Sequence, residues 1–283
     1  FLTHAPVHRV IGAMALPTII SMLLTSVYNL VDTFFVGQID TQSTAAVGIV
    51  FSVMFFIQAF SFFFGNGSGN YISRQLGAQK TEDAETMAST GLFYTFVFSV
   101  VIMLTGLLFL EPISILLGST PTILPYTCQY LGISLLGTPF IMGTFCINNQ
   151  MRFQGFAKYS VCGVVSGSII NCLLDPLFIY TFDLGIRGAA IATILSQTVA
   201  LVWQIRLFSD KSQLLHLKRG IYKLDNTIVK NILGIGISPF AMNATACLVA
   251  IFVNQRLLEY GGDLAVGAYG IANRVAFIFI MIN

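Results

Sequence analysis

Two aspartates, Asp32 and Asp175, lie inside long apolar stretches of the sequence, where charged side chains are rare. Asp32 is the only formal charge between positions 10 and 37, a stretch long enough to cross a lipid bilayer. A carboxylate at that depth is costly unless it is paired, hydrated or protonated. Asn171 precedes Asp175 by four residues and therefore shares its face of a helix. These residue types predict a site for a hard cation or a proton; the alternative is that both acids only stabilise helix packing.

The composition is that of an integral membrane protein. Of the 283 residues, 55% are hydrophobic and 9% are charged, and the mean hydropathy is +0.82. Soluble domains carry roughly 25% charged residues. The net charge of +2 is too small to indicate a nucleic-acid partner, and the five cysteines all lie in apolar runs without ligand or disulfide spacing. We therefore expect an all-α, polytopic transmembrane helical bundle.

Eight apolar runs are long enough to span the membrane as helices. They cover residues 10–37, 45–72, 86–110, 122–147, 159–182, 188–208, 228–258 and 264–283. The connections between them alternate in charge, and 11 of the 14 basic residues fall on one side. An excess of Lys and Arg marks the cytoplasmic side of a membrane protein. The prediction is a multi-pass protein of the cell (inner) membrane with its N-terminus in the cytoplasm.

The sequence contains an internal repeat at an offset of 222 residues. The first apolar run aligns with the seventh and the second with the eighth, without a gap. The matched pairs include Gly12 with Gly234, Pro17 with Pro239, Ala46 with Ala268, Gly48 with Gly270 and Ile49 with Ile271. Because six spans precede the second copy, the two copies run in parallel, as in transporters built from two halves around a substrate site.

The repeat predicts three parts of the chain. Residues 1–208 form an N-lobe of six transmembrane helices, 209–227 form a cytoplasmic linker between lobes, and 228–283 begin a C-lobe with helices seven and eight. On this interpretation about four helices of the second lobe are missing from the sequence, so that the chain is C-terminally incomplete.

Several motifs, in this order along the chain, resemble those of the multidrug and toxic compound extrusion (MATE) family, of the bacterial multidrug export type. They are PTIISMLLTSVYNLVDTFFVG at 17–37, GNGSGNYISRQLGAQ at 65–79, NNQMRFQG at 148–155, NCLLDPLFI at 171–179, GIRGAAIAT at 185–193 and LLEYGGDLAVGAYGIANRV at 257–275. The resemblance extends over the whole chain but over only about two-thirds of that family's usual twelve-helix length.

The resemblance implies an antiporter with two six-helix lobes, not an enzyme. Na⁺ or H⁺ would enter while amphipathic, often cationic drugs leave by alternating access, which confers antibiotic resistance. The ion site of related proteins falls here on Asp32, Asn171, Asp175 and Thr193. No cofactor is implied beyond the coupling ion, and the partners are drugs and the lipid bilayer. At full length such a protein is expected to be a monomer.

Further residues are candidates for moving the first helix or for lining a substrate cavity. Pro17 either acts as a hinge in the first span or is a tolerated kink. Asn254 takes the place of Asp32 in the second copy of the repeat, which predicts that the ion site belongs to one lobe only. The candidates for the cavity are Tyr28, Gln38, Met142, Gln150, Asn254 and Arg274.

Two other functions remain open from the sequence. One is a lipid-linked oligosaccharide flippase of the same superfamily, although such proteins tend to carry several cationic residues in the cavity and Arg274 is the only basic residue expected to be buried within a span here. The other is a truncated membrane protein that does not transport.

Overall fold

The computed structural model describes residues 7–208 and 226–282, and within these ranges it contains helices and no strand. This confirms the prediction of an all-α bundle. The elements, in chain order, are α1 (Val7–Gly37), α2 (Thr41–Gly77), α3 (Thr81–Leu108), α4 (Leu110–Leu116), α5 (Leu124–Leu136), α6 (Thr138–Phe153), α7 (Ala157–Pro176), the π-helix η1 (Leu177–Thr181), α8 (Ile186–Phe208) and α9 (Asn226–Ile282).

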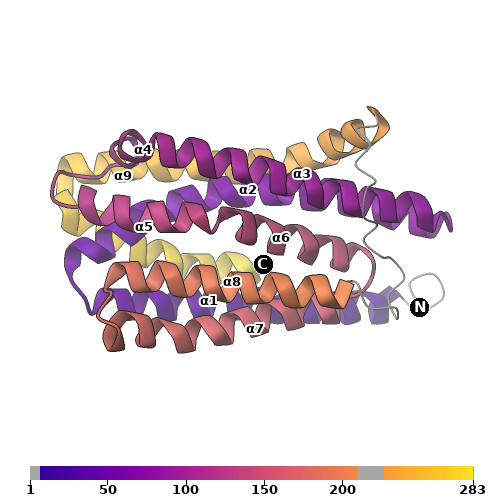
Figure 1. Ribbon diagram of the computed structural model, residues 1–283, viewed down its shortest axis with the longest axis horizontal. Coiled ribbons are helices and arrows are strands. Elements are labelled where there is room, and N and C mark those ends of the chain that lie inside the picture. Colours follow the sequence, from indigo (N-terminus) through magenta and orange to yellow (C-terminus); the bar gives the residue numbers. More distant parts are fainter. Residues whose placement is uncertain (1–6, 209–225, 283) are drawn as a thin grey trace.

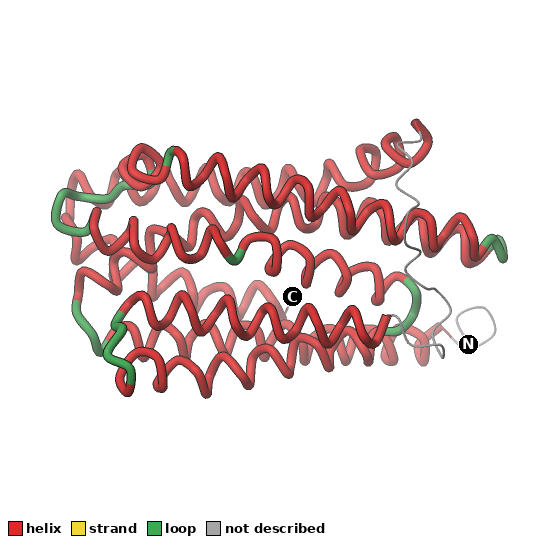
Figure 2. The backbone as a smooth tube through the Cα atoms, in the orientation of Figure 1, coloured by secondary structure: helices red, strands yellow, loops and turns green. Residues whose placement is uncertain are grey.

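The long helices run side by side along the long axis of the molecule (Figure 1). Their connections gather at two opposite ends (Figure 2). We call one end the Gly262 end: there α1 stops, α2 starts, α4 leads into α5, and α9 bends at Gly262. We call the other the Lys80 end, where Lys80 ends the connection from α2 to α3 and a second short connection leads from α6 into α7.

Six of the helices are long and apolar enough to cross a membrane, and α5 and α6 together form a seventh candidate span. The sequence predicts one span over 122–147, and the structure builds this candidate span from two helices, α5 and α6, which meet at an angle of 52°. Gly137 separates them and Pro139 stands at the start of α6. A proline cannot donate a backbone hydrogen bond to the preceding turn, so the helix breaks there.

Helix α9 contains both the seventh and the eighth predicted spans. It bends at Gly262, whose backbone (φ 62°, ψ −163°) is non-helical. Only glycine adopts this conformation readily, so Gly262 lets the chain turn back beside itself. We call residues 226–261 the first arm of α9 and 263–282 its second arm. The predicted linker at 209–227 lies almost entirely outside the described residues, and the division into lobes stays a prediction.

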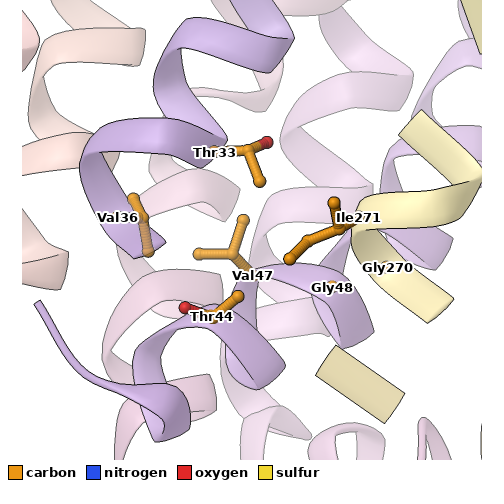
Figure 3. A pocket seen from close by; sticks show the side chains of 7 residues that line it. All are labelled: Thr33, Val36, Thr44, Val47, Gly48, Gly270 and Ile271. Atoms are coloured by element: carbon orange, nitrogen blue, oxygen red, sulfur yellow. The ribbon is translucent and has the colours of Figure 1, made fainter. Parts of the chain in front are cut away.

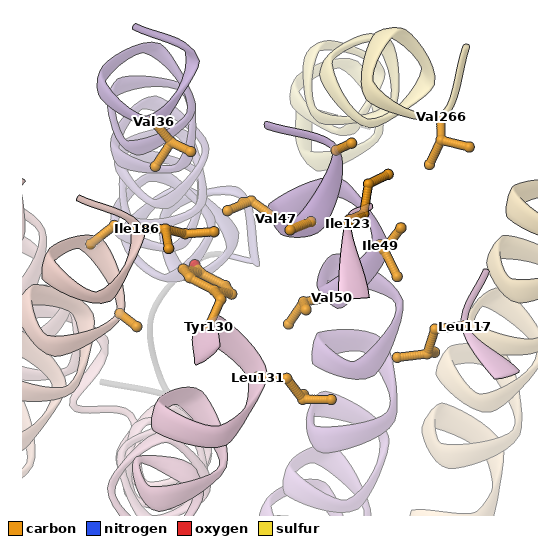
Figure 4. Close-up of a cluster of buried hydrophobic side chains, with 14 of the residues drawn as sticks. Val36, Val47, Ile49, Val50, Leu117, Ile123, Tyr130, Leu131, Ile186 and Val266 are labelled. Atoms are coloured by element: carbon orange, nitrogen blue, oxygen red, sulfur yellow. The ribbon is translucent and has the colours of Figure 1, made fainter. Parts of the chain in front are cut away.

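The apolar core is concentrated at both ends. At the Gly262 end it joins α2, α5 and the second arm of α9 through side chains such as Ile49, Leu131 and Val266, which are at most 1% exposed (Figure 4). A second cluster, toward the Lys80 end, includes Ile72, Met87 and Ile147. Between the clusters the interior contains polar side chains as well, and these form the candidate site.

Candidate cation site

Asp32 and Asp175 come from α1 and α7, which lie against each other in the bundle. Both carboxylates are buried: Asp32 is 5% exposed and Asp175 is fully enclosed. Their charges are close enough to interact. Two carboxylates in one buried place repel each other when both are ionised, so the arrangement favours a bound cation or a shared proton.

Asn171 connects the acid on α7 to a hydroxyl on α8. Its Nδ2 donates a hydrogen bond to Asp175 Oδ1 at 3.2 Å and lies 3.5 Å from Thr193 Oγ1. The Thr193 hydroxyl itself donates to the carbonyl of Ala189. The structure therefore brings together the four residues Asp32, Asn171, Asp175 and Thr193, as the sequence predicts.

Two acceptor oxygens of this cluster have no hydrogen-bond donor among the described residues. They are Asn171 Oδ1 and Asp175 Oδ2, and both are buried. A buried acceptor without a partner costs about 1–3 kcal/mol, and more when it is charged. A cation, a proton or a water molecule would satisfy both. No group of three or more His, Cys, Asp or Glu side chains suited to a metal ion occurs in the described part of the chain.

Glycines allow α7 and α8 to approach closely enough for this contact. A Cβ atom at Gly163 would lie within 2.4 Å of the Gln204 side chain, and one at Gly188 would lie 2.6 Å from the carbonyl oxygen of Phe178. Small residues at such positions let membrane helices pack backbone to backbone. The close packing of α8 against α7 and η1 sets Thr193 beside Asn171.

The backbone changes its winding directly after Asp175. Pro176 ends the α-helix, and the chain continues as the π-helix η1. Such π-helical turns are rare and are frequent at functional sites. Tyr180, in η1, donates its hydroxyl to the carbonyl of Phe35 at 3.0 Å and lies 3.0 Å from Gln38 Oε1. This contact ties η1 to the end of α1, the helix that carries Asp32.

A cavity of about 80 Å³ opens beside these residues. Drug-sized ligands occupy pockets of about 300–1,000 Å³, whereas a water molecule takes up about 30 Å³ in the liquid. The cavity therefore has room for an ion with one or two waters and not for a drug. Its walls come from five helices and consist of Thr25, Tyr28, Asn29, Asp32, Val47, Val50, Phe51, Met54, Gln58, Tyr130, Ile141, Phe145, Thr193 and Gln197.

The residues predicted to line a substrate cavity lie in different parts of the structure. Tyr28 lines the cavity. Gln38 is exposed near the Gly262 end, beside Tyr180. Met142 is fully buried in an apolar cluster with Ile57 and does not line the cavity. Gln150 is also fully buried and donates to Ser68 Oγ at 3.0 Å. The structure thus brings Tyr28 to Asp32 but does not bring Gln38, Met142 or Gln150 to this cavity, and their substrate role stays a prediction.

Three further candidates lie elsewhere in the helices. Asn254 is 2% exposed and donates to Ser52 Oγ at 3.2 Å, between α9 and α2. Arg274 is a residue of α9 and Pro17 a residue of α1. The side chains of both lie outside the described part of the molecule, so the cavity role of Arg274 and the hinge role of Pro17 stay predictions.

The structure adds polar residues that the sequence analysis did not single out. Asn29, Gln58 and Gln197 line the cavity together with Tyr130. Two of them could have been predicted from helical spacing. Asn29 precedes Asp32 by three residues and Gln197 follows Thr193 by four, so each shares a helix face with a predicted ligand. For Gln58 and Tyr130 we find no such signal.

Comparisons with known proteins agree with this architecture. The chain is 28% identical over 276 residues to the multidrug export protein MepA of Staphylococcus aureus (strain MRSA252), and 29% identical to MepA of Staphylococcus haemolyticus (strain JCSC1435). Each alignment covers 97% of this chain and 61% of the relative. The chain therefore spans about 61% of the length of these curated relatives.

Solved structures resemble the molecule over nearly all of its length. The MATE multidrug transporter DinF-BH, solved in complex with a ligand, matches with a TM-score of 0.91 at 28% identity, covering 97% of this chain and 62% of that one. An inward-facing MATE transporter of the MOP superfamily matches with a TM-score of 0.86 at 28% identity, over 96% of this chain and 62% of its own. The family model MatE matches residues 17–177, which include α1 from Pro17 onward and all of α2 to α7. This chain, a multi-pass membrane protein, belongs to the MatE family.

Proposed function

We propose that the protein is a cation-coupled antiporter that exports amphipathic, often cationic drugs. The observation that carries this proposal is the pair of buried acceptors, Asn171 Oδ1 and Asp175 Oδ2, which lack a donor and lie beside a second carboxylate, Asp32. The relatives support drugs as the exported substrates. One is called a multidrug export protein, and another, called a multidrug transporter, was solved in complex with a ligand.

The coupling ion is Na⁺ or H⁺. Na⁺ would be held by hard oxygen ligands, which the carboxylates, the Asn171 amide and the Thr193 hydroxyl supply. A proton would instead be shared between the two acids and relieve their repulsion. In either case the occupied site is close to neutral and the empty site carries excess negative charge at membrane depth, which is costly. Occupancy would therefore change which conformation of the surrounding helices is stable.

The drug would bind outside the small cavity. Its volume of about 80 Å³ suits an ion and not a drug. The drug would occupy the space that opens between the two repeat units, where aromatic and methionine side chains can accept flat, cationic molecules. The units are the lobes expected from the sequence: residues 1–208 form the N-lobe, and 228–283 begin the C-lobe.

The Lys80 end would face the cytoplasm of a bacterial cell and the Gly262 end would face outward. Among basic residues with described side chains, Arg74, Arg152, Arg206 and Lys230 lie in helix ends toward the Lys80 end, together with Lys80 itself, whereas Arg187 and Arg256 lie toward the Gly262 end. This asymmetry supports a cytoplasmic Lys80 end.

Efflux of a cationic dye from membrane vesicles, driven separately by a Na⁺ gradient and by a pH gradient, tests the proposal. Wild-type protein should respond to one of the two gradients. Asp32→Asn and Asp175→Asn should each reduce the driven rate at least about 100-fold, which corresponds to about 2.7 kcal/mol. Asp183→Asn is the matched control, because Asp183 is exposed in the loop after η1. Full driven efflux in Asp32→Asn and Asp175→Asn would refute the proposed coupling.

A further inference from the structure

Repeat-equivalent residues touch each other at the Gly262 end. Gly48 of α2 and Gly270 of α9 are equivalent at the offset of 222, and a Cβ atom on Gly270 would lie 2.9 Å from Gly48 Cα. Ala45 and Gly267 are equivalent at the same offset, and they also face each other, with a Cβ on Gly267 lying 3.8 Å from that of Ala45. Because equivalent residues meet only near a symmetry axis, the axis that relates the two repeat units passes between these helices.

The helices around this axis pack closely. Thr33 and Val36 of α1 and Thr44 of α2 surround Gly270 and Ile271 of α9 (Figure 3). The pocket between them has no room for a water molecule. Next to it, Val266 packs with Leu117 and Ile123 of the connection between α4 and α5 (Figure 4). At the Gly262 end the first repeat unit and α9 are therefore in direct contact, and we call this contact the seal.

Asn254 provides a buried polar bond in this seal. Its Nδ2 donates to Ser52 Oγ at 3.2 Å, and both residues are 2% exposed. Asn254 is the repeat equivalent of Asp32, but it faces α2 and not the cavity. Replacing an acid by an amide at this position removes an ion ligand and supplies a neutral donor, which can be buried with a single partner at little cost.

Two further hydrogen bonds, at exposed positions, join α9 to the first repeat unit in addition to the buried Asn254–Ser52 bond. Gln255 Nε2 donates to the carbonyl of Leu116 at 2.7 Å, and Thr122 Oγ1 donates to Asp263 Oδ2 at 2.8 Å. The first connects α9 to the end of α4 and the second connects α9 to the segment between α4 and α5, so both cross the same boundary between units. Bonds at exposed positions exchange easily with water, which makes them suited to repeated breaking and re-forming.

We propose that this seal is the outer gate of the transporter and that Asn254 is its buried latch. This inference rests on the proposed function. The gate opens when the Asn254–Ser52 bond breaks and α9 separates from α2 at the Gly262 end. Toward the Lys80 end the same helices stay together, because a Cβ on Gly67 would lie 2.8 Å from Ile232 Cα and the rings of Phe60 and Phe240 are 5.0 Å apart. Separation at one end with contact kept at the other is a hinge motion.

Access of a thiol reagent to a buried position tests the latch. In a background without the five native cysteines, Ala45→Cys is placed on α2 against Gly267 and exposed to a charged, membrane-impermeant maleimide from each side of the membrane in turn. Ser52→Ala and Asn254→Leu should each speed labelling from the Gly262 side about tenfold, because loss of one buried hydrogen bond shifts a two-state equilibrium by about that factor. Ser61→Ala is the matched control, since the Ser61 hydroxyl is buried in the same helix and donates within it, to the Ile57 carbonyl.

Equal labelling rates in all these variants would overturn the proposal. A cross-link provides a second, independent test. In the double variant Thr122→Cys with Asp263→Cys of the full-length protein, a short reagent that joins the two thiols should stop dye efflux until the link is reduced. Full efflux from the cross-linked protein would also overturn the gate. If the protein shows no efflux before cross-linking, the proposed function fails, but the labelling experiment still decides whether the latch exists.

Discussion

Asp32 and Asn254 occupy the same position in the two copies of the repeat, yet their surroundings differ in almost every respect. Asp32 lines a cavity with a second acid nearby, and Asn254 is packed against α2 with a single hydroxyl partner. The acceptor oxygens of Asn171 and Asp175, in the site of Asp32, lack a hydrogen-bond donor, whereas Asn254 is buried and hydrogen-bonded to Ser52. The difference supports the proposal that the two copies of this helix pair have different tasks, in which the first binds the ion and the second holds the two units together.

Exchanging the residues at positions 32 and 254 should have the largest effect on transport. The double variant Asp32→Asn with Asn254→Asp keeps the number of carboxylates constant. We expect no cation-driven efflux, a loss of at least about 100-fold, because the carboxylate moved to the second position would have neither Asp175 nor the cavity beside it. Dye efflux from vesicles measures this, with Asn254→Asp alone as the control for damage to the latch. Recovery of driven efflux in the exchanged protein would show that the two positions are equivalent in function.

A methyl group on the symmetry axis tests the packed region alone. Gly270→Ala places a Cβ 2.9 Å from the backbone of Gly48, so the helices must move apart. We expect a loss of about 1–3 kcal/mol in the stability of the closed state, seen as a lower thermal unfolding temperature in detergent. Gly234→Ala, in the same helix with nothing within 4 Å of the added methyl, should be neutral or slightly stabilising. Equal effects of the two changes would remove the argument for a tight axis.

The smallest effect is expected from removing a single hydroxyl group from the proposed ion site. Thr193→Val keeps the shape of the side chain and removes the hydroxyl next to Asn171, which should weaken binding of the coupling ion about tenfold. The ion dependence of dye efflux measures it, as a higher ion concentration for half-maximal rate. Thr198→Val is the control, because that hydroxyl, also in α8, donates to Ile194 of its own helix. An unchanged ion dependence would exclude Thr193 from the site.

The sequence predicts the grouping of Asp32, Asn171, Asp175 and Thr193 better than the rest of the cavity lining. A buried charge is expensive, so Asp32 and Asp175 stand out in an apolar run without any knowledge of the fold. Gln150 is just as unusual in type, but its amide is used to join α6 to α2 through Ser68. Only the packing of helices decides which polar side chain faces a cavity and which faces a neighbouring helix.

The fold was predictable to a similar degree. Long apolar runs predict the helices, because their backbones must satisfy their own hydrogen bonds in lipid. The break between α5 and α6 and the π-helix after Asp175 depend on how neighbouring residues accommodate the prolines. The hydrophobic periodicity of the sequence does not contain this information. The repeat is visible in sequence, but the meeting of Gly48 with Gly270 on its axis is visible only in three dimensions.

We propose that one ion site, in the first repeat unit, is linked to drug binding. It is tested most directly by adding a cationic dye to the purified full-length protein in weakly buffered solution and measuring released H⁺ and Na⁺ with electrodes. We expect release of one of these ions on dye binding, and we expect this release to be abolished in Asp32→Asn and retained in Asn254→Leu. Dye binding without release of either ion, or release that persists in Asp32→Asn, would contradict it.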